Sequence, residues 1–250
     1  MPGVQGKVAF ITGAASGIGR ATARVLAQGG ADIVVCDLNL PGAEATAQEL
    51  GAAGRRALAL RVDVTNLAEV EAAVAKSRQE LGKIDILLSN AGIAEQAAFV
   101  EMTEAQWDRM FNVHVNGAYN CFRAILPGMR AANWGRLIST SSMGAFTGGV
   151  RLSHYCAAKA AIAGLTISMA SELARTGITV NAVAPGVIDT PMVQASPTRW
   201  VDRMTRTIPM RRMGKPEDIA HAVAYIASEE AGFLTGQILS PNGGSHMKWC

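Results

Sequence analysis

Cysteine is rare in this sequence of 250 residues. Its four cysteines, Cys36, Cys121, Cys156 and Cys250, are widely spaced and form no C-x-x-C pair, which indicates free thiols in a reducing cytosol. Charge is also scarce, since charged residues make up 17% of the chain and the net charge is +3. We therefore expect no nucleic-acid or membrane partner and, because no metal-ligand spacing is visible, no metal site.

Long apolar segments are missing as well. Residues 1–7 contain no apolar core after a basic start, so we expect no signal peptide. No run of 18 apolar residues suggests a membrane span, although hydrophobic residues make up 49% of the chain. The composition predicts a cytoplasmic protein with a large buried core.

What the sequence does contain is a regular alternation of short β-branched runs and longer runs rich in Ala and Leu. The predicted strands are 8–12, 32–36, 57–62, 84–89, 136–140, 178–184 and 237–239, and the predicted helices are 17–29, 42–53, 67–81, 104–131, 155–175 and 216–228. This alternation predicts an α/β protein, a single-domain doubly wound Rossmann fold over residues 1–250. We expect a seven-stranded parallel sheet with helices on both faces.

One segment, 190–215, shows no clear helix or strand period. An irregular segment of this length in a compact domain is commonly a lid. Its apolar residues Met192, Val193, Trp200 and Met204 are candidate substrate contacts, or they simply pack on the core.

A glycine-rich turn joins the first predicted strand to the first predicted helix. It reads Thr12-Gly13-Ala14-Ala15-Ser16-Gly17-Ile18-Gly19. Glycines permit a tight turn, and the unpaired N–H groups of the helix start attract phosphate. The residues from Gly13, Ser16 and Gly17 to Ile18 and Gly19 are therefore candidate nucleotide-binding residues, although the glycines could serve the turn alone.

An acid, Asp37, stands at the end of the second predicted strand, about 20 residues after the glycines. A carboxylate there accepts both hydroxyls of an adenosine ribose and repels a 2′-phosphate. No Arg or Lys lies within the glycine turn. Asp37 and its neighbour Leu38 therefore predict NAD as the cofactor rather than NADP, and a helix-capping role for Asp37 stays open.

Tyr155 and Lys159 are four residues apart in a predicted helix. This spacing places both side chains on one face. A fixed cation beside a phenol favours the phenolate and lowers its pKa toward the working range of an acid/base catalyst.

Together these pieces resemble the short-chain dehydrogenase/reductase family over residues 6–244. The matching motifs are Thr12-Gly13-x-x-x-Gly17-Ile18-Gly19, Asp63-Val64, Asn90-Ala91-Gly92, Ser142, Tyr155-x-x-x-Lys159, Asn181-x-x-x-Pro185-Gly186 and Gly243-Gly244. The resemblance implies an oxidoreductase that interconverts a secondary alcohol and a ketone by hydride transfer.

The resemblance also implies a role for each motif. Ser142 would hold the substrate oxygen, Tyr155 would transfer the proton, and Lys159 would bind the nicotinamide ribose and lower the pKa of Tyr155. Asp63 and Val64 would contact adenine, Asn90, Ala91 and Gly92 would line the floor of the cofactor site, and Pro185, Gly186, Ile188 and Thr190 would hold the nicotinamide.

The sequence departs from the family pattern at His114. The family usually has an asparagine seven residues after a position that is Trp107 here, and that asparagine completes a proton relay. A histidine can donate or accept, so His114 is a candidate fourth catalytic residue, and a buried structural histidine is the alternative. Asn112 and Asn116 should point elsewhere.

The substrate is less defined than the chemistry. Residues 143–146 and 94–98 are expected pocket walls, and a mostly apolar alcohol or ketone is favoured. Five arginines of the lid segment, Arg199, Arg203, Arg206, Arg211 and Arg212, could instead meet an anionic thioester carrier, or they lie on a solvated face. The alternatives are a 3-oxoacyl-thioester reductase and a non-catalytic NAD-binding regulator.

The resemblance implies a homotetramer formed through 104–131, 153–176 and 216–244.

Overall fold

The computed structural model describes residues 3–196 and 198–247. Its sheet consists of β1 (Val8–Thr12), β2 (Asp32–Asp37), β3 (Ala57–Arg61), β4 (Ile86–Ser89), β5 (Gly135–Thr140), β6 (Ile178–Val183) and β7 (Ile238–Leu239). The seven strands are ordered β3-β2-β1-β4-β5-β6-β7, and each neighbouring pair is parallel. The predicted α/β fold with a seven-stranded parallel sheet is confirmed.

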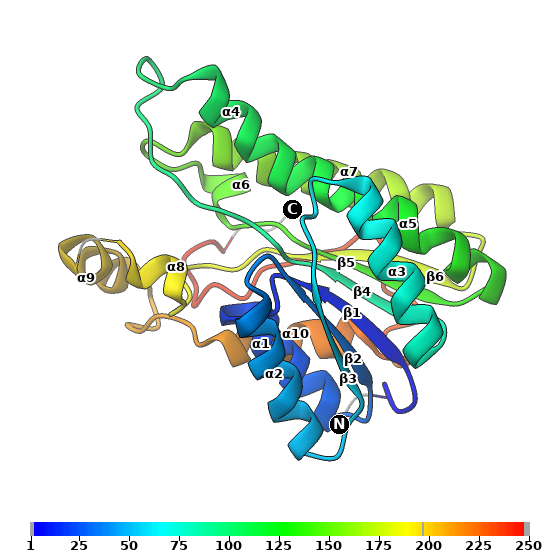
Figure 1. Cartoon of the computed structure of the whole chain (residues 1–250). Helices are drawn as coiled ribbons and strands as arrows, with labels where there is room; N and C mark the ends of the chain where they lie inside the picture. Colours follow the sequence, from blue (N-terminus) through cyan, green and yellow to red (C-terminus); the bar gives the residue numbers. More distant parts are fainter. Residues whose placement is uncertain (1–2, 197, 248–250) are drawn as a thin grey trace.

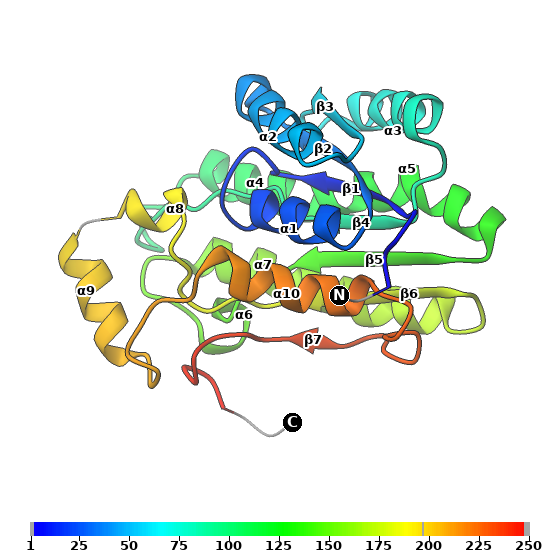
Figure 2. The ribbon, with the colours of Figure 1, turned by 90° about the horizontal axis from the view of Figure 1, so that it is seen from below.

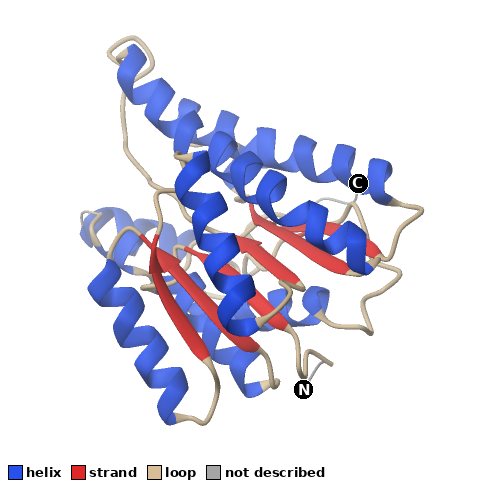
Figure 3. Cartoon of the chain, turned by 45° about the vertical axis from the view of Figure 1, so that its right-hand side comes forward, coloured by secondary structure: helices blue, strands red, loops and turns tan. Residues whose placement is uncertain are grey.

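Helices cover both faces of this sheet (Figures 1 and 3). The longer helices are α1 (Gly17–Gln28), α2 (Leu40–Ala52), α3 (Leu67–Leu81), α4 (Glu104–Phe111), α5 (Gly117–Ala132), α7 (Ser153–Leu173), α9 (Thr198–Thr207) and α10 (Pro216–Ala227), and the four-residue helices are α6 (Gly144–Thr147) and α8 (Pro191–Gln194). Most observed bounds lie within a few residues of those expected from the sequence.

The sheet separates two apolar cores, as the alternating side chains of β1 illustrate. Ala9 and Ile11 face a core shared with α1, α2 and α10, whereas Val8 and Phe10 face a core shared with α3, α5 and α7. Successive strand residues point to opposite faces, so a strand covered on both sides is apolar throughout. This explains why the predicted strands show no polar alternation.

The long helix predicted at 104–131 is not continuous. A π-helical turn, η1 (Asn112–Asn116), separates α4 from α5. Such a turn inserts one extra residue into the helix. Past this turn Gly117 packs against Val64 so closely that a β-carbon would lie 2.7 Å from the valine Cγ2. A hydrophobic period cannot reveal a one-residue insertion, which is why the sequence predicted one helix.

The segment 190–215, expected to be irregular, contains the helices α8 and α9 (Figure 2). A bridge between Ile188 and Gly214 joins the two ends of the segment. In α9 the larger apolar residues Trp200, Val201 and Met204 are only half-buried. The apolar residues and the arginines of α9 alternate at helical spacing, so the sequence carried a helix signal here that the expectation of an irregular segment overlooked.

Helix α7 differs from expectation in another respect. By length and composition alone it could cross a membrane, with a mean hydropathy of 1.2, whereas no such segment was expected. In the structure it packs on β5 and β6 and carries the buried Lys159. Of the cysteines, Cys36 and Cys121 are buried and Cys156 is half-buried, all as free thiols, and Cys250 lies outside the described residues.

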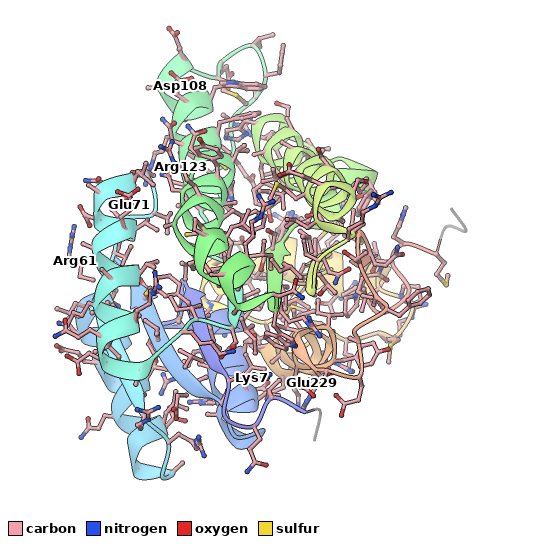
Figure 4. The ribbon with its side chains drawn as sticks, turned by 90° about the vertical axis from the view of Figure 1, so that its right-hand side faces the viewer. Lys7, Arg61, Glu71, Asp108, Arg123 and Glu229 are labelled. Carbon is pink, nitrogen blue, oxygen red and sulfur yellow. The ribbon has the colours of Figure 1, made fainter. Side chains whose placement is uncertain are left out.

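At the amino ends of the strands, an ion pair links the start of β1 to the end of α10. The Lys7 ammonium, just before β1, lies 2.9 Å from the Glu229 carboxylate after α10 (Figure 4). Because Glu229 is exposed, we expect the pair to add less than about 1 kcal/mol to stability. Stability depends mainly on the two apolar cores.

Candidate active site

A cleft of about 590 Å³ runs along the carboxyl ends of the strands. It is lined by residues that follow β1 and β4, the neighbouring strands between which the strand order reverses. In open parallel sheets the chain leaves these two strands in opposite directions, which opens a crevice for a ligand. The cleft is therefore where the fold itself places a dinucleotide.

The glycine turn forms one wall of the cleft. Gly13 and Gly17 have φ angles of 65° and 53°, a left-handed conformation that suits glycine. Gly19 does not line the cleft, because it lies beneath the turn, where a β-carbon would overlap the carbonyl group of Gly13. The turn therefore needs glycine at positions 13 and 17 for its backbone shape, and at position 19 so that α1 can pack closely against the Gly13 carbonyl group.

Asn90 connects the turn to the central strands. Its amide nitrogen donates to the carbonyl oxygens of Thr12 (3.1 Å) and Gly13 (3.2 Å), and its carbonyl oxygen accepts from Thr140 (3.2 Å). The Thr12 hydroxyl in turn accepts from the N–H groups of Asn90 and Ala91, both at 3.0 Å. The Asn90-Ala91-Gly92 segment is thus held under the cleft by bonds to β1 and β5.

The predicted adenosine end is also assembled. Asp37 accepts hydrogen bonds from the N–H of Ala15 (3.0 Å) and of Asn39 (2.9 Å), so its carboxylate borders the glycine turn. It does not cap α2, because the side chain of Asn39 does so. Leu38 is exposed at the rim. The remaining lone pairs of the Asp37 carboxylate can accept ribose hydroxyls.

Asp63 and Val64 follow β3 directly beside Asp37, whose carbonyl oxygen accepts from the N–H of Val62 (3.1 Å). One Asp63 oxygen accepts from the N–H (2.9 Å) and the hydroxyl (2.7 Å) of Thr65. The amide of Asn120 on α5 donates to the Val64 carbonyl oxygen (2.8 Å). These bonds hold the loop after β3 open toward the cleft.

Lys159 reaches the cleft from α7 and is 4% exposed. Its ammonium donates to the carbonyl oxygen of Thr140 at the end of β5 (2.7 Å), and its own carbonyl oxygen accepts from Ser141 (2.8 Å). Burial disfavours the cation and lowers the pKa of Lys159 to about 7. A lysine with such a pKa exchanges its proton near neutral pH.

Tyr155 and Ser142 lie beside Lys159 in the same cleft. The Lys159 ammonium is 5.8 Å from the centre of the Tyr155 ring. Burial raises the pKa of Tyr155, and its hydrogen bond with Ser142 opposes that shift. The structure differs here from the expectation of a lowered Tyr155 pKa, because the effect of burial outweighs that of the Ser142 hydrogen bond.

His114 faces the same group from η1, with its ring perpendicular to Tyr155 at a centroid distance of 5.6 Å. Its Nε2 lies 2.9 Å from the carbonyl oxygen of Ile93, and its Nδ1 has no partner among the described residues. Burial, reinforced by the Lys159 charge, lowers the pKa of His114 to about 3, so the ring is neutral. Asn112 and Asn116 point outward as expected and bond to each other at the surface (2.6 Å).

The last wall follows β6. Pro185, Gly186, Ile188 and Thr190 all line the cleft. A β-carbon on Gly186 would lie 2.8 Å from the Cα of Asn242, so the turn packs against the segment after β7. Asn181 of the same motif lies outside the lining and bonds the Leu234 carbonyl oxygen (2.7 Å).

The structure thus brings every predicted site residue except Gly19 into one cleft lining. Of the predicted substrate contacts, Met192 and Val193 join the lining, whereas Trp200, Met204 and the walls at 143–146 and 94–98 do not. Sequence reasoning missed further lining residues: Cys36, Val62, Thr65, Ile93, Arg109, Val113, Thr140, Ser141 and Pro191. Most of these flank a predicted motif, which is the signal that could have found them, and Arg109, one turn before Val113 on α4, had none.

The residues fit a nicotinamide dinucleotide. A β-carbon on Gly13 would lie 3.0 Å from the Ala91 Cα, so the glycine leaves open a cradle that a side chain would fill. The α1 N-terminus supplies N–H groups for a diphosphate, and Asp37 supplies acceptors for a ribose.

The comparisons with known proteins agree with this geometry. Residues 13–246 match the sequence model of a family described as enoyl-(acyl carrier protein) reductase. The chain is 43% identical over 239 residues to a cis-4-hydroxycyclohexanecarboxylate dehydrogenase of Sinomonas cyclohexanicum, covering 95% of this chain and 96% of that protein. It is 39% identical over 245 residues to the (2S)-[(R)-hydroxy(phenyl)methyl]succinyl-CoA dehydrogenase subunit BbsD of Thauera aromatica, covering 98% of each.

A solved structure of similar shape is the short-chain dehydrogenase/reductase SDR:glucose/ribitol dehydrogenase from Brucella melitensis. It superposes with a TM-score of 0.93 at 32% identity and covers 99% of each chain.

Proposed function

The chain belongs to the short-chain dehydrogenase/reductase family, and from that premise we propose that it interconverts a secondary alcohol and a ketone with NAD(H). Oxidoreductases of this family use nicotinamide cofactors. The observation that carries the proposal is the convergence of Ser142, Tyr155 and Lys159 on one cleft beside the glycine turn.

In this reaction the side chains handle the proton while the nicotinamide, when bound, exchanges hydride with the substrate carbon. The hydroxyls of Ser142 and Tyr155 hold the substrate oxygen. As an alcohol is oxidised, the Tyr155 oxygen accepts the hydroxyl proton, and in the reverse direction it returns that proton to the ketone oxygen. Lys159, whose pKa is about 7, exchanges a proton with its surroundings near neutral pH and stabilises the phenolate when charged.

Asp37 supports NAD(H) over NADP(H). Its carboxylate borders the turn where the adenosine ribose would lie, and a 2′-phosphate there would meet a negative charge.

We propose that His114 is the fourth catalytic residue and completes the proton relay. Its neutral ring lies beside the Tyr155 ring, and its Nδ1 has no partner among the described residues and is free to bond a relay water or the substrate. Because its pKa is about 3, it acts as a hydrogen-bonding group and not as a titrating one above roughly pH 5.

The substrate proposal has two candidates. A mostly apolar alcohol or ketone suits Met192 and Val193 in the lining. A 3-oxoacyl or hydroxyacyl thioester is favoured by the similarity, at 39% identity, to the (2S)-[(R)-hydroxy(phenyl)methyl]succinyl-CoA dehydrogenase subunit. Both candidates require the same proton transfer at Tyr155.

The first prediction concerns Tyr155. Replacing it by Phe removes the transferable proton, so we expect kcat to fall by about 10²–10⁴-fold while NADH still binds. Steady-state kinetics and fluorescence titration with NADH measure the two effects. The matched control is Tyr225→Phe at an exposed tyrosine, and a Tyr155→Phe enzyme with normal kcat would remove the proposed mechanism.

The second prediction concerns the cofactor. In Asp37→Ala the repulsion of a 2′-phosphate is lost, and Asp37→Ala/Leu38→Arg adds an attractive charge. We expect the ratio of kcat/KM with NADPH to that with NADH to rise roughly tenfold in the single variant and further in the double variant. A wild-type enzyme that already prefers NADPH would contradict the assignment.

The third prediction concerns His114. Removing the ring in His114→Ala should lower kcat by roughly tenfold or more, and His114→Asn should recover part of it, because an amide also donates and accepts hydrogen bonds. Because the His114 ring is neutral between pH 5 and 9, the pH profile of kcat in wild type should show no inflection from His114 in this range. If His114→Ala keeps both the rate and the profile, the residue is structural.

We further propose a homotetramer formed through residues 104–131, 153–176 and 216–244. Only 39% of an 18-residue apolar stretch of α7 is buried within the chain, and Ile167 on this helix is exposed. Sedimentation velocity at micromolar concentration should give four times the mass of one chain, and a monomer would contradict this.

A further inference from the structure

Helix α9 of the lid segment has two unlike faces. Trp200, Val201 and Met204 are half-buried, whereas Arg199, Arg203 and Arg206 are exposed. Residues at i, i+4 and i+7 lie on one side of a helix. The three guanidinium groups therefore share one exposed side of α9. This side also carries the exposed carboxylate of Asp202, so three cations and one anion leave it with a net charge of +2. We call the three arginines the arginine face (Arg199, Arg203, Arg206).

The charges of this face are not committed to other groups of the chain, in contrast to the two arginines that follow it. Arg211 donates to the carbonyl oxygen of Arg206 (2.7 Å) and closes the end of α9, and Arg212 pairs with Asp218 (2.8 Å). No salt bridge found within 3–196 and 198–247 includes a residue of the arginine face. Unpaired cations clustered on one exposed face attract a polyanion.

The location of α9 relates the arginine face to the cleft. Helix α8, which ends at Gln194, supplies Met192 and Val193 to the cleft lining, and α9 begins at Thr198. Figures 1 and 2 both show α9 beyond α8, at the outer edge of the molecule past the carboxyl ends of the strands. A substrate that extends from the cleft over α8 would reach the arginine face.

We propose that the arginine face binds the phosphate groups of a coenzyme A thioester whose acyl carbonyl lies beside Tyr155. This inference rests on the proposed function, because it names the substrate class of that same site. Arginine pairs with phosphate through two parallel hydrogen bonds, and coenzyme A carries a diphosphate and a 3′-phosphate at one end and the acyl group at the other. Three cations on a face only ten residues long suit this compact cluster of anions better than the broad surface of a carrier protein.

The test compares two esters that differ only in the phosphate-bearing end: acetoacetyl-CoA and acetoacetyl-N-acetylcysteamine. The variant is Arg199→Gln/Arg203→Gln/Arg206→Gln, and the control is Arg78→Gln at an exposed arginine of α3, on the opposite side of the molecule (Figure 1). With saturating NADH, we expect the ratio of kcat/KM for the CoA ester to that for the short ester to fall by roughly tenfold to a hundredfold in the triple variant. The ratio should stay as in wild type in Arg78→Gln, and added salt should lower it in wild type.

The outcomes separate this inference from the proposed function. If wild type and triple variant show the same ratio, the arginine face does not bind coenzyme A, while turnover of either ester leaves the oxidoreductase standing. If wild type reduces simple ketones but neither thioester, the inference is likewise overturned. If the triple variant loses activity only toward acetoacetyl groups on an acyl carrier protein, the face is a protein-binding surface and the coenzyme A proposal is wrong. If wild type turns over no carbonyl compound at all, the proposed function itself fails.

Discussion

The buried ammonium of Lys159 and its hydrogen bond to the Thr140 carbonyl oxygen (2.7 Å) organise the whole cleft. The Thr140 hydroxyl donates to the side-chain oxygen of Asn90, and the Asn90 amide nitrogen donates to the carbonyl oxygens of Thr12 and Gly13. One continuous chain of polar contacts therefore joins α7 to β5, β4 and β1 at the reversal of the strand order. A buried polar network of this kind specifies one arrangement, because breaking any bond leaves a buried group without a partner.

The same burial decides how the charges behave. It lowers the pKa values of Lys159 and His114 and raises that of Tyr155, so each of the three groups is pushed toward its neutral form. Because the pKa of Lys159 is lower in the folded than in the unfolded chain, folding loses stability as the pH falls from about 10.5 toward 7. The protein accepts this cost at the site where proton exchange is needed, which is typical of catalytic centres.

Much of this arrangement could be predicted from the sequence, because the fold depends on the hydrophobic period within each element and on the order of the elements along the chain. The β-branched runs gave the strands, and the position of Gly13, Asp37, Asn90, Ser142 and Pro185 after successive strands gave the edge where they meet. The exceptions have physical causes. Gly19 serves helix packing and not the cleft. The π-turn at His114 adds a residue without changing the hydrophobic pattern, and the direction of the Tyr155 pKa depends on burial, which spacing does not report. Helix α9 was missed although its apolar residues and arginines alternate at helical spacing, because it is only ten residues long and lies in a segment with no other regular period.

The central claim is that the Lys159 side chain is buried and bonded to Thr140, with a pKa far below that of an ordinary lysine. The most direct measurement is a nuclear magnetic resonance titration of the protein with isotope-labelled lysine side chains, with Lys159→Met used to assign the signal. The account predicts that the Lys159 signal titrates near pH 7, well apart from the other lysines. A Lys159 signal that titrates together with the exposed lysines above pH 10 would contradict it.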